Sequence, residues 1–369
     1  MQESTMFVGL DVHKDSIAVA LAPAGQGEVR AYGDIAGNLE AVDKMIRRLR
    51  QSHEKLDFVY EAGPCGYALH RHLTSKGLPC AVVAPSMIPR RPGDRIKTDR
   101  RDAVSLAKLH RAGELTAVHV PDPQDEAVRD LTRAREDAVL AHKRARQQFA
   151  ALLLRQNIRY SGKRAWTQGY KNWIARITMP QPVQQIVFQE YMNAIDETNQ
   201  RVERITEQIR LALDAWRMAP VARALQALKG VSLIASASIV AELGDLTRFD
   251  HPRQLMAFLG LVPSQYSSGP RQRFGSITKT GNSHARRMLV EAAWAYRFSA
   301  RVARGLSERQ ENLPQAARDI AWRAQLRLCK KYRRLVAKGK IKQVVTTAIA
   351  RELLGFMWAI AKEVKPLAA

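Results

Sequence analysis

Four carboxylates stand where structured segments of this sequence begin or end. Asp11 closes the hydrophobic run FVGL near the N-terminus, and Glu61 closes a second run, FVY. Asp99 and Asp102 follow in KTDRRDA, where a helical pattern begins, and a spacing of three places both on one side of a helix. If the strands that end at Asp11 and Glu61 are neighbours, the sequence predicts that all four carboxylates converge.

Converging carboxylates repel one another and raise their own pKa values unless cations relieve the repulsion. An all-oxygen ligand set suits Mg²⁺ or Mn²⁺, and two such ions about 4 Å apart support in-line attack on a phosphodiester. Each residue also has an ordinary explanation: Asp11 as a turn former, Asp99 as a helix cap, Glu61 as a surface charge. The combination on a strongly basic chain favours a metal site.

The composition points to a polyanionic partner. The 369 residues carry a net charge of +24 with a pI near 10.4, and 46% are hydrophobic, which is typical of a folded protein. Nucleic acid explains this charge better than an anionic membrane, because the basic residues are spread along the chain. Three scattered cysteines indicate a reducing interior, and the longest apolar run, near Leu353–Ala361, is too short to span a bilayer. We therefore expect a cytoplasmic protein without a membrane partner, associated with the nucleoid when active.

The first region has the pattern of an α/β domain. We expect three strands that form an antiparallel meander, followed by strands that join through helical crossovers. The strands are expected at residues 6–10, 16–21, 28–32, 58–60 and 80–84, and helices at 39–50, 67–76 and 100–110.

The middle of the chain is helical. Residues 127–152 and 195–216 each carry one narrow apolar stripe, which predicts two long helices that pair with each other or with a second copy of the chain. An ordinary antiparallel hairpin fits the pattern equally well.

A basic, aromatic linker, residues 155–176, separates these helices and contains six cations and no acid. Cations beside flat rings are suited to tracking a phosphate backbone and stacking on bases, so we predict nucleic-acid contact. The alternative is a loop whose rings pack on the helices. The predicted contact residues are Arg155, Arg159, Lys163, Arg164, Trp166, Tyr170, Lys171 and Trp173.

The last region contains two further signals for nucleic acid. LKGVSLIASASIVAELGDLTRF resembles a helix-hairpin-helix, with Gly230 in the turn but Ser232 where a second glycine is usual, so a purely structural hairpin is as good an interpretation. Residues 323–342 carry nine basic residues and no acid, which favours a polyanion.

A polar, glycine-punctuated stretch, PSQYSSGPRQRFGSITKTGNSHARR, is expected to be a loop. Its cations could bind the phosphate that a serine hydroxyl attacks, although a serine in a loop more often caps a turn. The cations predicted to contact nucleic acid are Arg271, Arg273, Lys279, Arg286 and Arg287.

Three N-terminal motifs carry a family resemblance: GLDVHKDSIAVAL, YEAGPCGYALHRHL and IKTDRRDAVSLAKLHRAGEL. They resemble those of the DEDD transposases of the insertion sequence one-ten family, with its 1111 subgroup as a candidate. The block from LKGVSLIASAS to GSITKTGN is similar to that family's C-terminal transposase domain, so nearly the whole chain is covered.

The resemblance implies a fold and a set of site residues. The fold is an α/β ribonuclease-H-like domain, similar to Holliday-junction resolvases, over residues 1–120. An α-helical coiled-coil region over 121–220 and a mainly α-helical C-terminal transposase domain over 221–369 follow. By position, Asp11, Glu61, Asp99 and Asp102 match the family's catalytic, metal-binding carboxylates. The family's serine, which follows a tyrosine and precedes a glycine, matches Ser268, with Ser267 as the competing register.

The resemblance also implies an activity and partners. These are metal-dependent cleavage and rejoining of double-stranded DNA at element ends and target, guided by a structured RNA. The resemblance implies a homo-oligomer as well, either a dimer or a tetramer built as a dimer of dimers. In it, the serine of one protomer acts beside the carboxylates of another. Two alternatives stay open: a structure-selective nuclease of resolvase type that uses water, and a non-catalytic protein that bridges DNA.

Overall fold

The computed structural model describes residues 5–89, 98–268 and 271–367. The chain forms two compact units, Met1–Pro121 and Asp122–Ala369. The regions predicted at 121–220 and 221–369 both fall within the second unit. Each unit is described by itself.

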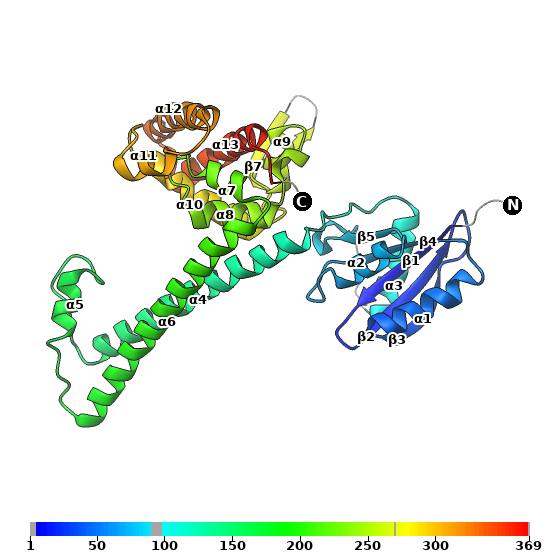
Figure 1. Ribbon diagram of the computed structural model, residues 1–369, viewed down its shortest axis with the longest axis horizontal. Coiled ribbons are helices and arrows are strands. Elements are labelled where there is room, and N and C mark those ends of the chain that lie inside the picture. Colours follow the sequence, from blue (N-terminus) through cyan, green and yellow to red (C-terminus); the bar gives the residue numbers. More distant parts are fainter. Residues whose placement is uncertain (1–4, 90–97, 269–270, 368–369) are drawn as a thin grey trace. The chain divides into compact units, whose positions relative to one another are not determined.

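The first unit is a five-stranded sheet with helices on both faces (Figure 1). Its strands are β1 (Thr5–Val12), β2 (Ser16–Pro23), β3 (Arg30–Ala36), β4 (Lys55–Glu61) and β5 (Cys80–Val83). Its helices are α1 (Leu39–Arg50), α2 (Ala68–Ser75), α3 (Asp99–Arg111) and the short 3-10 turn η1 (Pro85–Met87). All five predicted strands and three predicted helices are present within a few residues of their expected bounds.

The strand order is β3-β2-β1-β4-β5. β1, β2 and β3 pair antiparallel, whereas β4 lies parallel to β1 and β5 lies parallel to β4. The predicted meander and crossovers are therefore confirmed. β1 and β4, which carry two of the predicted carboxylates, are direct neighbours.

The two faces of this sheet are packed differently because side chains alternate along each strand. One face bears large residues, including Leu10, Val19 and Phe58, and packs against α1 and α2. The other face bears small residues, including Ala18 and Ala20, and packs against α3.

The second unit is largely helical. Its long helices are α4 (Pro123–Arg155), α6 (Pro182–Ala215), α12 (Gln315–Ala337) and α13 (Lys342–Glu363). Its shorter helices are α5 (Gln168–Ile174), α7 (Ala219–Leu225), α8 (Leu233–Leu243), α9 (Pro252–Phe258), α10 (Ser283–Ala293) and α11 (Arg304–Gln310), with 3-10 turns η2 (Leu246–Arg248) and η3 (Trp294–Arg297). A two-stranded sheet, β6 (Pro263–Ser268) and β7 (Arg271–Ile277), completes it.

Helices α4 and α6 pair with each other along their length as an antiparallel hairpin (Figure 1). At one end, the Trp216 indole nitrogen, just after α6, donates to the Asp125 carboxylate at 2.8 Å, and Arg217 contacts the same carboxylate. At the other end, the rings of Phe149 and Phe188 lie 5.3 Å apart. The predicted pairing of the two helices with each other is confirmed, and pairing with a second copy of the chain stays a prediction.

Helix α13 is 22 residues long and apolar enough, by length and composition, to cross a membrane, and is the one such helix among the described residues. The apolar run near Leu353–Ala361, which is too short to span a bilayer, is only part of this helix. Val345, Ile349, Leu353 and Met357 are buried in the main core of the second unit. Its apolar character is therefore that of a core helix.

Candidate active site

Asp11 and Glu61 lie at the carboxyl ends of two parallel neighbouring strands. The β1–β4 register pairs Leu10 with Tyr60, so the next residues along each strand, Asp11 and Glu61, lie side by side. Leu10 and Tyr60 belong to the core beneath α1 and α2. Because side chains alternate along a strand, Asp11 and Glu61 point to the opposite face, which α3 covers.

Helix α3 approaches this face closely because the contact residues are small. A Cβ atom on Gly9 would lie 2.3 Å from the Ala103 carbonyl oxygen and 2.5 Å from the Ala107 nitrogen, both in α3. Ala103 and Ala107 are themselves fully buried against the alanines of β2. Glycine at position 9 therefore allows α3 to lie directly on β1.

The first turn of α3 carries the other two predicted carboxylates. The helix is capped by Thr98, whose side chain accepts a hydrogen bond from the Arg101 amide, so Asp99 is the first helical residue and not the cap. Asp99 and Asp102 both lie in this turn, where the helix dipole favours negative charge. Both interact electrostatically with Asp11 and raise its pKa.

His13, which was not among the predicted site residues, joins this group. Its Nε2 lies 3.3 Å from Asp11 Oδ2 and 3.5 Å from Asp99 Oδ1. Burial raises the pKa of Asp11, His13 lowers it, and Asp102 and Asp99 raise it further, so that the net shift is upward. A divalent cation bound beside these carboxylates would favour their ionised form.

The donor atoms fit a divalent metal ion. One atom each from Asp11, His13 and Asp99 lies within 4.8 Å of the others, which is the one such group of three or more among the described residues. The side chain of Asp11 is largely buried, whereas those of His13 and Asp99 are exposed, so the group opens to solvent.

Ser268 ends β6 of the second unit, in a segment that was expected to be a loop. That expectation was wrong, because PSQYSS and RQRFGSI pair as an antiparallel hairpin. Strand pairing opposes Ser268 to Arg271 and Tyr266 to Arg273. These four residues therefore share one face of the hairpin, and all are exposed.

Ser267 lies on the other face of the same hairpin. It opposes Gln272, and its hydroxyl accepts a hydrogen bond from the Gln265 amide at 2.7 Å. Its cross-strand neighbours are thus uncharged, in contrast to those of Ser268.

Two of the predicted phosphate-binding cations have other partners. Arg286 donates to the carbonyl oxygens of Leu259 and Thr280 at 2.9 and 2.7 Å, and burial lowers its pKa. Arg287 pairs with Glu136 of α4 and with Glu291. Both arginines therefore have partners within the second unit, and their contact with nucleic acid stays a prediction. Arg271, Arg273 and Lys279 stay candidates, since all three are exposed.

The linker between α4 and α6 folds around its own aromatic rings. Tyr170 is buried and its ring lies 4.9 to 5.3 Å from those of Tyr160, Trp166 and Trp173. The rings therefore pack on one another and Tyr170 is buried among them, whereas contact of the partly buried Trp166 and Trp173 with a base stays a prediction. The linker's cations, in contrast, are exposed on this cluster: Arg155, Arg159, Lys163, Arg164, Lys171 and Arg176.

The segment that resembles a helix-hairpin-helix does form a helical hairpin between α7 and α8. Gly230 adopts a left-handed conformation with φ of 84°, and a Cβ there would lie 2.3 Å from the Ala292 carbonyl oxygen. Ser232 caps α8 by accepting from the Ala235 amide. The glycine is thus required by packing against α10, and phosphate binding here stays a prediction.

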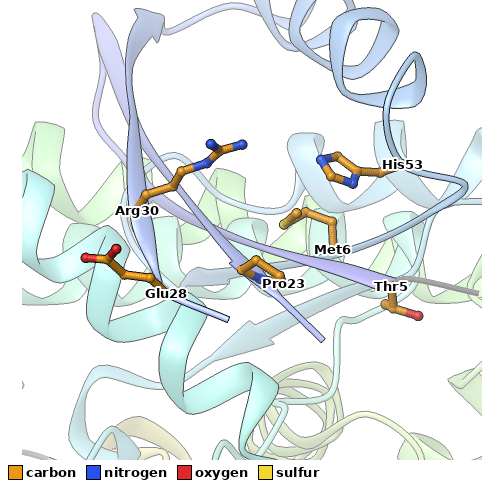
Figure 2. Close-up of a pocket in the computed structure, with 6 residues that line it drawn as sticks. All are labelled: Thr5, Met6, Pro23, Glu28, Arg30 and His53. Atoms are coloured by element: carbon orange, nitrogen blue, oxygen red, sulfur yellow. The ribbon is translucent and has the colours of Figure 1, made fainter. Parts of the chain in front are cut away.

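A separate cavity of about 380 Å³ lies at the other end of β1 (Figure 2). Thr5 and Met6, at the start of β1, line it together with residues that include Arg30 and His53. It shares no residue with the acidic group, so we do not assign it to the same chemistry.

Two family models match this chain. The one described as "Transposase IS116/IS110/IS902 family" matches residues 222–307, and the one described as "Transposase", for the DEDD domain of IS110 elements, matches residues 8–158. The DEDD match over a five-stranded, ribonuclease-H-like α/β unit and the transposase match over the largely helical second unit define a DEDD-type transposase, which is an enzyme of DNA transposition.

Relatives that match most of this chain agree with this class. A putative transposase of Sinorhizobium fredii is 47% identical over 360 residues, 97% of this chain and 89% of that protein. The transposase for insertion sequence element IS1533 of Leptospira borgpetersenii is 30% identical over 91% of this chain and 98% of that protein. The transposase for IS1111A of Coxiella burnetii is 24% identical over 63% of this chain. The chain belongs to the IS110 family of transposases.

Proposed function

We propose that this transposase cuts and rejoins DNA strands with divalent metal held by Asp11, Glu61, Asp99 and Asp102. One observation carries the proposal: the ends of β1 and β4 and the first turn of α3 meet on one face of the sheet. Mg²⁺ or Mn²⁺ bound there would polarise a phosphodiester and stabilise the charge that develops on its oxygens.

Ser268 is the nucleophile in this proposal. Arg271 and Arg273 share its face of the β6–β7 hairpin and can hold the phosphate under attack, which favours Ser268 over Ser267. Attack of the Ser268 oxygen on phosphorus forms a phosphoserine ester and breaks one phosphodiester bond. The serine proton ends on the released deoxyribose hydroxyl.

A phosphoserine ester conserves the energy of the broken bond. A hydroxyl from a second DNA strand can therefore attack the ester, release the serine and form a new phosphodiester without an external energy source. Hydrolysis by water, as in a resolvase-type nuclease, would lose that energy and leave the strands cut. Strand-joined products thus separate the two activities.

The proposal extends to a guide RNA and an oligomer. The linker's exposed cations form a surface suited to a phosphate backbone. We further propose that the Ser268 hairpin of one protomer acts beside the carboxylates of another, in a dimer or a tetramer. Membership of the 1111 subgroup and action in the bacterial cytoplasm belong to the same proposal.

Neutralising the carboxylates tests the metal site. Asp11→Asn and Glu61→Gln should abolish cleavage and strand transfer in Mg²⁺ while leaving the circular dichroism spectrum unchanged. Asp34→Asn is the matched control, because Asp34 is an exposed carboxylate of the same sheet. Full activity of both site variants would refute the proposal.

Reversing linker charges tests RNA contact. Lys163→Glu with Arg164→Glu should lower RNA retention and reduce its salt dependence, since each phosphate contact contributes to the salt slope. Arg47→Glu with Arg48→Glu, an adjacent exposed pair on α1, is the control for net charge. Equal RNA losses in both double variants would mean that the linker has no specific role.

A further inference from the structure

His13 differs from the other histidines that contact carboxylates in the first unit. His72 lies 2.7 Å from Asp43, which also binds Lys76, and His110 lies 2.9 Å from Asp57. Among the described residues, each of those two histidines has one carboxylate contact. His13 reaches two carboxylates through the same Nε2, and they come from different elements, Asp11 from β1 and Asp99 from α3.

The spacing of these atoms fits one coordination sphere. An octahedral ion with bonds of about 2.1 Å places neighbouring ligand atoms about 3 Å apart and opposite ones about 4.2 Å apart. Nε2 lies 3.3 and 3.5 Å from the two oxygens, and all three atoms fall within 4.8 Å of one another. His13, Asp11 and Asp99 can therefore serve as ligands of one ion with small side-chain adjustments.

A stabilising role does not explain this arrangement. The side chains of His13 and Asp99 are 51% and 62% exposed. Contacts between groups this exposed contribute little to folding. His13 lies in the short connection between β1 and β2, which holds its imidazole beside two carboxylates. Binding of a metal ion explains this position better than a contribution to folding does.

We propose that His13 is a nitrogen ligand in the acidic metal site, which gives this transposase a preference for a divalent transition metal such as Mn²⁺ over Mg²⁺. Mg²⁺ is bound almost wholly by oxygen, whereas imidazole nitrogen binds transition metals well. The inference rests on the proposed metal site. It adds to the four carboxylates a fifth residue, two positions after Asp11.

The test detects the nitrogen directly, without any activity measurement. Full-length protein is labelled with ¹⁵N-histidine and loaded with Mn²⁺, and pulsed electron paramagnetic resonance records the coupling between the bound ion and ¹⁵N. Wild type should show this coupling, and His13→Gln should lose it. His72→Gln, which removes a histidine from a carboxylate contact in the same unit, should retain it.

Affinity gives a second measurement. His13→Gln should bind Mn²⁺ at least about tenfold more weakly, with a smaller loss for Mg²⁺, so that the preference between the ions shrinks. Bound Mn²⁺ without histidine coupling, or coupling that persists in His13→Gln, would overturn the inference and leave the carboxylate site standing. Failure of wild type to bind Mn²⁺, with Asp11→Asn indistinguishable from it, would overturn both.

Discussion

Replacing Gly9 by alanine should disable the site without touching any predicted ligand. The new Cβ would lie 2.3 Å from the Ala103 carbonyl oxygen, and ordinary contacts begin at 3.4 Å. The obstacle is helix backbone, which cannot rotate away, so α3 must retreat by about 1 Å and carry Asp99 and Asp102 with it. Overpacking of this kind costs about 1–3 kcal/mol of unfolding free energy, and a misplacement of about 1 Å can cost about 100-fold in rate.

The assay pairs chemical denaturation with cleavage of element-end DNA under single-turnover conditions. Gly63→Ala is the control, because its Cβ would meet only the Glu61 carbonyl oxygen at an ordinary 3.9 Å. Gly9→Ala should bind DNA normally, unfold more easily and cleave about 100-fold more slowly. If it cleaved at the wild-type rate, the close approach of α3 would not be what positions the acidic residues.

Two further predictions concern the stability of the second unit. Asp125→Ala should lower the unfolding free energy by about 3 kcal/mol, because the buried carboxylate binds Trp216 and Arg217 where α4 meets the end of α6. A thermal unfolding midpoint equal to that of wild type would contradict this prediction. Burial alone would raise the pKa of Glu242, but hydrogen bonds from Arg133 and Asn282 outweigh it and hold the pKa below its ordinary 4.5. The stability that this lowered pKa contributes is present above pH 4.5 and is lost as the pH falls through the lowered pKa. Glu242→Gln should therefore make the free energy of unfolding less dependent on pH in that range and lower it by about 1–3 kcal/mol near neutral pH. Acid unfolding identical to that of wild type would refute this prediction.

Much of the first unit could be predicted because local patterns and topology agreed. The hydrophobic runs FVGL and FVY mark β1 and β4, and the parallel crossover between these two strands places their carboxyl ends together. The convergence of Asp11 and Glu61 followed from that rule. His13 could not be predicted in the same way, since its contact with Asp99 depends on how closely α3 packs over Gly9.

The sequence-based predictions that missed features of the second unit failed for physical reasons as well. The β6–β7 hairpin is exposed on nearly all of its residues, so no hydrophobic alternation marked its strands. The contact of Arg287 with Glu136 joins residues 151 positions apart, and no local pattern could reveal it. The aromatic residues of the linker pack into a cluster of their own. Packing removes their apolar surface from water even when no nucleic acid is bound, which stabilises this arrangement.

The central claim is that a covalent bond forms between Ser268 and DNA. Full-length protein, guide RNA, Mn²⁺ and an element-end duplex should yield a protein–DNA adduct, and mass spectrometry after nuclease and protease digestion should place the phosphate on Ser268. Ser268→Ala should bind metal and DNA but form no adduct, whereas Ser267→Ala should form it. An adduct on Ser267, or strand exchange by Ser268→Ala, would contradict the account.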